Sequence, residues 1–278
     1  PLNLSTKEYI NFVVNGMTSI RYFIPLTIEG NARGIKSRYF IYPSHKYNCP
    51  VSRNNNLALQ QYAKQYNFDI FDISLVDKFS GDFFLVEGDY RESYGRYIDN
   101  VDFVIFPSPY VSSLCDTNVN EAKSLYLGSP KYDVSFNNNE ICNKYKISDN
   151  GKKAFVVLPR KRDVRKVDFK VLYESLTGMG FDILTKTRGK DPYQQSGMHG
   201  NYHYMDFSWF PHDSMEMIYI SDIVINFSST AIKECVMLNK PIVNFHVKPS
   251  FRRFDELYHY NYCIELGASF DGKAIQES

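Results

Sequence analysis

Three consecutive hydroxyl residues, Ser228, Ser229 and Thr230, form the segment of this sequence best suited to chemistry. They join an apolar run, residues 222–227, to a segment with a helical pattern, residues 230–239. The first backbone N–H groups of a helix have no partner within it and carry partial positive charge. In an open α/β sheet, such a turn faces the crevice beyond the carboxyl ends of the strands. The turn therefore predicts a phosphate-binding site.

Glu234 follows Thr230 by four residues, so a helix would place both side chains on one face. A carboxylate is a poor neighbour for phosphate, but it can accept hydrogen bonds from the two hydroxyls of a ribose. The alternative is structural, because Ser and Thr often cap helices and Glu234 would then be solvated. The residues alone leave both interpretations open.

Basic residues follow two other predicted strands. Arg160 comes directly after the apolar run 154–159, and Lys186 ends the run 181–186. Because parallel strands bring their carboxyl ends to one edge of a sheet, we expect these two side chains to clamp a diphosphate. The competing interpretation is a solvated basic loop.

Two further residues precede the predicted strand at 222–227. Phe210 is a candidate to stack on a nucleotide base, although packing in the core is the more common role of such a ring. His212, between Pro211 and Asp213, is a candidate contact for a phosphate or a sugar. A histidine exposed at the start of a helix is the alternative.

The composition is that of a globular protein, with 278 residues, 44% hydrophobic and 23% charged. A net charge of +1 does not favour nucleic acid as a partner. The five scattered cysteines lack a C-x-x-C pair, which argues against a zinc site or a disulfide framework and favours a reducing, cytoplasmic location. No apolar run reaches the roughly 18 residues of a membrane span, and the N-terminus lacks a signal-peptide pattern.

Apolar runs alternate with helical patterns along the whole chain, which indicates an α/β protein with parallel sheets. The strand-like runs are 38–42, 68–73, 83–88, 101–106, 154–159, 181–186, 222–227 and 241–246, and the helical segments are 56–66, 167–178 and 230–239. The polar, asparagine-rich segment 133–153 is the expected seam between two Rossmann-like domains. We assign residues 1–135 to the first domain, 150–260 to the second, and 261–278 to a C-terminal tail.

The segment 221–245 resembles the nucleotide-sugar site in the carboxyl half of GT-B-fold glycosyltransferases. It also resembles the related UDP-N-acetylglucosamine 2-epimerases and glycerophosphotransferases. Ser228, Ser229 and Thr230 match the diphosphate-binding turn, Glu234 matches the ribose-binding acid, and "LNKP" matches the helix stop. Phe227 departs from the pattern, because many members carry Asp or a small residue there. Weaker likeness extends over residues 120–250.

The resemblance implies two domains with a cleft between them, the first for the acceptor and the second for the sugar donor. It implies transfer of a sugar from a nucleotide, a UDP-sugar, to a glycan or another hydroxyl acceptor. Inverting transfer needs a general base, for which the candidates near strand ends are His45, Glu87 and Asp89, with Glu87 preferred. The sequence has no Asp-x-Asp pair to hold a divalent ion, so we expect no metal and no cofactor.

Other functions stay open. A UDP-sugar 2-epimerase would share the donor site, a glycerophosphotransferase-like enzyme would share the hydroxyl turn, and an inactive nucleotide-sugar-binding module would lack a base. The Gly178–Gly180 segment lacks the third glycine of a dinucleotide fingerprint and fits a helix end better. Because the sequence begins at Pro1, we expect a processed methionine or further domains, and a place in a multi-enzyme glycan assembly system is a hypothesis.

Overall fold

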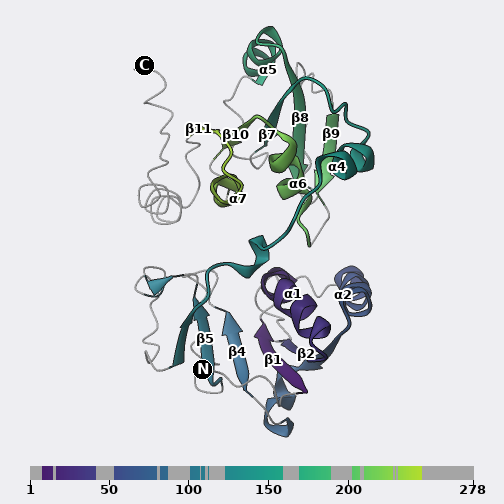
Figure 1. The fold of residues 1–278 in the computed structure, drawn as a ribbon, viewed down its shortest axis with the longest axis vertical. Coiled ribbons are helices and arrows are strands. Elements are labelled where there is room, and N and C mark those ends of the chain that lie inside the picture. The colour runs from purple at the N-terminus through teal and green to yellow at the C-terminus, as the bar shows by residue number, and fades with distance from the viewer. Residues whose placement is uncertain are drawn as a thin grey trace. The chain divides into compact units, whose positions relative to one another are not determined.

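The computed structural model describes most of the predicted secondary structure. The described residues are 8–14, 17–41, 53–79, 82–86, 101–106, 108–109, 112, 123–158, 169–188, 202–206, 210–227, 229 and 231–245. The chain divides into two compact units, residues 1–134 and residues 135–278. Each unit contains a parallel sheet with helices packed on it (Figure 1).

The first unit is built on a six-stranded sheet. Its strands are β1 (Tyr9–Val14), β2 (Lys36–Ile41), β3 (Phe68–Asp72), β4 (Phe83–Val86), β5 (Phe103–Phe106) and β6 (Ser124–Tyr126). They lie in the order β3-β2-β1-β4-β5-β6, and every neighbouring pair is parallel. This is the order of doubly wound Rossmann folds, in which ligands bind where the chain reverses direction across the sheet. Here that point lies between β1 and β4.

Aromatic side chains fill much of the core of the first unit. Helix α1 (Met17–Ala32) lays Phe23 against Phe12 of β1, with ring centroids 4.2 Å apart. The hydroxyl of Tyr39 on β2, fully buried, lies 2.6 Å from the Thr27 hydroxyl of α1, which satisfies both polar groups. The unit also contains α2 (Arg53–Tyr66) and two 3₁₀ turns, η2 (Ile73–Lys78) and η5 (Pro130–Tyr132).

The second unit is built on a five-stranded parallel sheet. Its strands are β7 (Lys152–Val157), β8 (Phe181–Arg188), β9 (Tyr202–Asp206), β10 (Ile223–Phe227) and β11 (Ile242–Phe245). Their order is β11-β10-β7-β8-β9, so the direction of winding changes between β7 and β10. Its helices are α4 (Asn138–Tyr145), α5 (Phe169–Gly178), α6 (Asp213–Ile220) and α7 (Ala231–Met237).

The helices of the second unit cover both faces of its sheet (Figure 1). Alternation along β7 separates the two cores: Phe155 and Val157 belong to one cluster with residues of α4, α6 and α7, and Ala154 and Val156 belong to the other with residues of α5. A strand buried on both faces is a continuous apolar run, which is why the sequence indicated it.

The predicted fold class is confirmed, and each of the eight apolar runs overlaps a strand. The segment 133–153, predicted as a seam, contains α4, a helix of the second unit. Asn137 caps that helix by accepting hydrogen bonds from two backbone N–H groups, and Ile141 and Cys142 are buried in the core. The asparagine-rich stretch is therefore a helix start, for which Asn is well suited.

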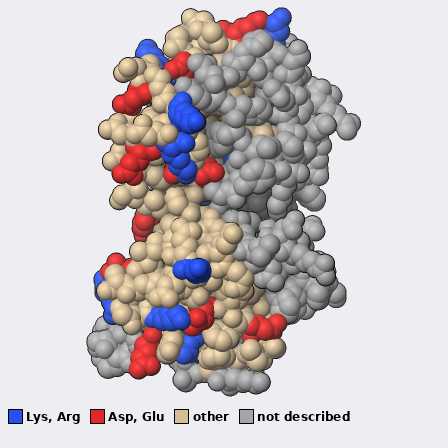
Figure 2. Space-filling view, turned by 90° about the vertical axis from the view of Figure 1, so that its right-hand side faces the viewer, with Lys and Arg blue, Asp and Glu red and all other residues tan. Residues whose placement is uncertain are grey.

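On the face that Figure 2 shows, charged side chains of both signs are interspersed over the described surface. This distribution agrees with the net charge of +1 and offers no broad basic face for a polyanion there. Among the helices that the structure describes, none combines the length and the apolar character needed to cross a membrane.

Candidate functional site

Polar residues line the carboxyl edge of the second sheet on both sides of its switch point. Val157 of β7 is paired with Lys186 of β8 on one side and with Asn226 of β10 on the other, and Asn226 is paired with Asn244 of β11. Paired residues in neighbouring parallel strands point to the same face of a sheet. Lys186 and Asn226 therefore flank Val157 on the face covered by α6 and α7.

Asn226 connects this row to the turn that follows β10. Its side chain is completely buried, and its Nδ2 donates to the backbone oxygen of Ser229 at 3.1 Å and to Oδ1 of Asn244 at 2.7 Å. The Oδ1 of Asn226 has no hydrogen-bond partner in the described part of the chain. The bond to Asn244 holds the Asn226 amide within the sheet, and the bond to Ser229 ties the turn before α7 to that amide.

Within the predicted phosphate turn, the structure describes Ser229 but not Ser228 or Thr230. The Oγ of Ser229 accepts a hydrogen bond from the backbone N–H of Ala231 at 3.4 Å, and its backbone oxygen accepts one from Ile232. Ser229 therefore contacts the first turn of α7 as a capping residue does. Glu234 is half-buried in the first turn of the same helix.

Lys186 and His212, predicted separately, are brought together through Ser214. The Lys186 ammonium group donates a hydrogen bond to the Oγ of Ser214, and that oxygen lies 2.8 Å from Nδ1 of His212. His212 occupies the N-cap position of α6, and Ser214 is the second residue of that helix. The three side chains thus join the end of β8 to the start of α6.

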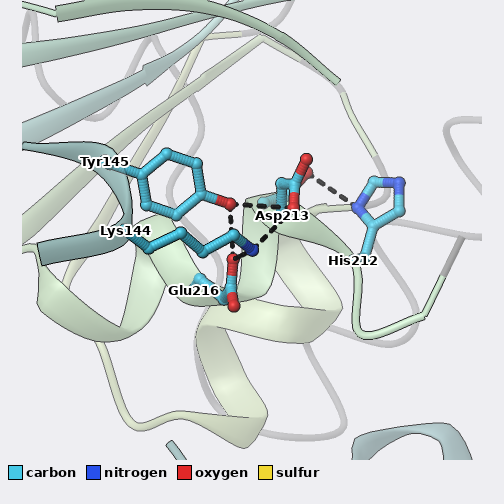
Figure 3. Close-up of polar contacts among 6 residues, drawn as sticks. Lys144, Tyr145, His212, Asp213 and Glu216 are labelled. Atoms are coloured by element: carbon cyan, nitrogen blue, oxygen red, sulfur yellow. Dashed lines mark hydrogen bonds and ion pairs between the residues drawn. The ribbon is translucent and has the colours of Figure 1, made fainter. Parts of the chain in front are cut away.

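A second polar cluster fixes the other side of the first turn of α6 (Figure 3). Lys144 of α4 lies 2.7 Å from Glu216 and 3.4 Å from Asp213, and the Tyr145 hydroxyl donates to both carboxylates. The side chain of Glu216 is only 10% exposed. A buried carboxylate is tolerated in a protein when it is paired and hydrogen-bonded, as it is here.

The cluster shifts the pKa values of both α4 residues. Burial alone would lower the pKa of Lys144, but its hydrogen bond to Glu216 and the two carboxylate charges outweigh burial, so the pKa is raised. The pKa of Tyr145 is also raised, first by burial and then by its hydrogen bonds to the two carboxylates. Both groups are therefore held in their protonated forms.

The remaining predicted site residues are described only in part. Phe210 is half-buried and precedes a cis peptide bond to Pro211, and its stacking on a base stays a prediction. Arg160 and the three base candidates His45, Glu87 and Asp89 lie outside the described residues. Strand β4, paired with β1 at the switch point of the first sheet, ends at Val86, the residue before Glu87.

Sequence reasoning missed Asn226 and Ser214. Asn226 lies inside an apolar strand pattern, and an amide in such a run is itself a signal of a buried polar contact. Ser214 carries no comparable signal, because its contact with Lys186 joins residues 28 positions apart. Within the described ranges, no three His, Cys, Asp or Glu side chains are grouped as metal ligands.

The comparisons with known proteins find similarity in structure but not in sequence. No family model matches the sequence, and no curated protein matches it. Among solved structures, a glycotransferase of kitacinnamycin has a TM-score of 0.56 at 10% identity, covering 96% of this chain and 86% of that one. A Listeria monocytogenes protein assigned as a UDP-N-acetylglucosamine 2-epimerase has a TM-score of 0.55 at 10% identity, covering 91% and 82%.

The wall teichoic acid polymerase TagF has a TM-score of 0.52 at 18% identity, covering 87% of this chain and 71% of that one. These likenesses identify the fold as the α/β fold of GT-B glycosyltransferases and the proteins related to them. At such low identity they describe the fold and not the reaction.

Proposed function

We propose that the protein is a GT-B-type glycosyltransferase that moves a sugar from a nucleotide donor to a hydroxyl group of a glycan acceptor. The observation that carries the proposal is that the polar residues Lys186 and Asn226 flank Val157 at the switch point of the second sheet, next to the Ser229 turn. Open α/β sheets bind nucleotides at that place. We further propose that the donor is a UDP-sugar and that the enzyme works in the cytoplasm without a metal or cofactor.

In the proposed reaction, the second unit holds the donor. Lys186, His212 and the N–H groups of the turn at 228–230 stabilise the charge that develops on the diphosphate as it leaves. Arg160 is a further candidate for that role, and Glu234 accepts hydrogen bonds from the ribose hydroxyls. Glu87 of the first unit removes the proton from the acceptor hydroxyl, which then attacks the anomeric carbon from the face opposite the leaving group.

A panel of nucleotides and nucleotide sugars tests this proposal. We expect UDP to raise the melting temperature more than GDP or CDP, because a ligand that binds only the folded state stabilises it. Incubation with the matching UDP-sugar should then release free UDP, faster with a glycan acceptor, and the rate should survive EDTA. An isomerised sugar nucleotide without free UDP would instead identify an epimerase, and stabilisation by CDP would favour a glycerophosphotransferase-like enzyme.

A further inference from the structure

The hydroxyl of Ser214 lies between a cationic side chain and an imidazole ring. Ser214 is 1% exposed, and its Oγ accepts a hydrogen bond from the Lys186 ammonium group. The same oxygen is 2.8 Å from Nδ1 of His212. The elements that carry these residues are fixed independently, because β8 is paired within the sheet and α6 packs in the core through Met217 and Ile218.

Hydrogen-bond chemistry limits how these three groups share their protons. A lysine ammonium group has donors and no acceptor, so Lys186 can only donate to the Ser214 oxygen. Serine has a single hydroxyl proton, and Nδ1 of a neutral histidine either accepts that proton or carries its own. If Nδ1 carries its own proton, the N–H dipole of the ring and the Lys186 cation would both direct positive charge at the Ser214 oxygen.

The arrangement in which Nδ1 accepts the Ser214 proton is electrostatically the better one. It directs the Nδ1 lone pair toward the side of the ring on which the Lys186 charge lies. At the N-cap of α6, it also keeps the Nδ1 proton away from the positive end of the helix dipole. The tautomer of a histidine is set by the hydrogen bond that one of its nitrogens makes. With Nδ1 as the acceptor, the ring proton must be on Nε2.

We propose that Ser214 is a positioning residue that fixes neutral His212 as its Nε2–H tautomer. His212 then meets a ligand as an N–H donor and does not take a proton through Nε2. The group it would contact is an anionic or carbonyl oxygen, and in the proposed function this is an oxygen of the donor diphosphate. The identity of the ligand therefore rests on the proposed function, whereas the tautomer of His212 does not.

Nitrogen NMR of the full chain without ligand tests the tautomer directly. Long-range proton–nitrogen correlation spectra distinguish a protonated from an unprotonated ring nitrogen, and His212→Gln identifies the signal among the six histidines. At a pH where the ring is neutral, we expect Nδ1 of His212 to be unprotonated and Nε2 protonated. A protonated Nδ1 in the neutral wild-type ring would overturn the proposal.

Ser221 offers a matched control for the role of the hydroxyl. It is also 1% exposed, lies at the C-cap of α6 and donates to the backbone oxygen of Met217 at 2.6 Å. We expect Ser214→Ala to give a mixture of the two His212 tautomers and Ser221→Ala to leave the wild-type tautomer unchanged. An unchanged tautomer in Ser214→Ala would show that Ser214 does not set it.

Calorimetry with pyrophosphate and UDP separates this inference from the proposed function. Ser214→Ala should lower the affinity for both ligands by about two- to tenfold, the scale of one hydrogen bond. Ser221→Ala should leave both affinities unchanged. If the tautomer is as expected but neither ligand binds the wild type, the positioning role stands and the proposed function fails. If UDP binds the wild type but Nδ1 carries the proton, the function stands and the positioning role fails.

Discussion

Tyr145 of α4 donates a hydrogen bond of 2.5 Å to Oε2 of Glu216 on α6, and the same hydroxyl donates to Asp213 at 2.8 Å. Asp213 is the residue between His212 and Ser214 in the sequence. The contact therefore fixes the first turn of α6 from α4 (Figure 3). Lys186 contacts the same turn from strand β8, through Ser214. Helix α4, in the segment predicted as a seam, supports the candidate site from outside it.

Removing the Tyr145 hydroxyl should destabilise the second unit. Tyr145→Phe keeps the ring but deletes the hydroxyl whose one proton is shared between the carboxylates of Asp213 and the buried Glu216. We expect the free energy of unfolding to fall by about 2 kcal/mol, because hydrogen bonds to charged groups contribute about 1.5–3 kcal/mol. Denaturant titration measures the loss. Tyr219→Phe is the control, since that ring packs on Phe136, and an equal loss in both variants would contradict the expectation.

Stability should also fall at alkaline pH. The pKa of Lys144 is raised from 10.5 and that of Tyr145 from 10.0 in the folded chain. A raised folded-state pKa gives stability that is complete below the unfolded value and is lost as the pH rises through the folded value. Above about pH 10, where the unfolded pKa values lie, we expect the wild type to lose stability more steeply than Lys144→Met/Tyr145→Phe. Parallel curves from denaturant titrations would show that the cluster does not couple folding to pH.

The sequence predicts the interior strands except β1, because strands buried on both faces are apolar along their whole length. It also misses two edge strands, the three-residue β6 and β9, whose sequence, YHYMD, is mostly polar. The residues of the candidate site also divide into those that the sequence indicates and those that it does not. Lys186 and Ser229 were found because they stand where strands end, whereas the Ser214 contact depends on how α6 packs against the sheet. Sequence spacing does not encode that packing.

Lys186 should recognise the diphosphate and not the nucleoside. Lys186→Met keeps most of the apolar stem and deletes the charge, so we expect UDP affinity to fall by roughly ten- to a hundredfold, as for the loss of a charged hydrogen bond. Uridine affinity should be unchanged. Lys152→Met is the control, because Lys152 is exposed at the amino end of the neighbouring strand β7. Calorimetry that finds UDP binding equal in both variants would remove Lys186 from the donor site.

Glu87 should affect turnover without affecting donor binding. Glu87→Gln removes the proposed base, and we expect kcat to fall by roughly 10²–10⁴-fold, the usual contribution of a positioned general base. The affinity for UDP, measured by calorimetry, should stay close to that of the wild type. If kcat hardly changes, the base is another residue, and His45→Gln and Asp89→Asn are the next variants to compare.

Glu234 separates the nucleotide-binding interpretation of the 221–245 segment from the structural one. As a ligand of ribose hydroxyls, its carboxylate accepts two hydrogen bonds, and Glu234→Gln weakens both while keeping the shape of the side chain. UDP affinity should then fall by about tenfold or more, the scale of hydrogen bonds to a charged group. Pyrophosphate has no ribose, so its weaker binding should be unchanged or improved, because one negative charge near the diphosphate is gone. If Glu234 is only a solvated residue in the first turn of α7, the variant shifts the melting temperature slightly and leaves both affinities equal to those of the wild type. Calorimetry with the two ligands on the same preparation distinguishes the two roles.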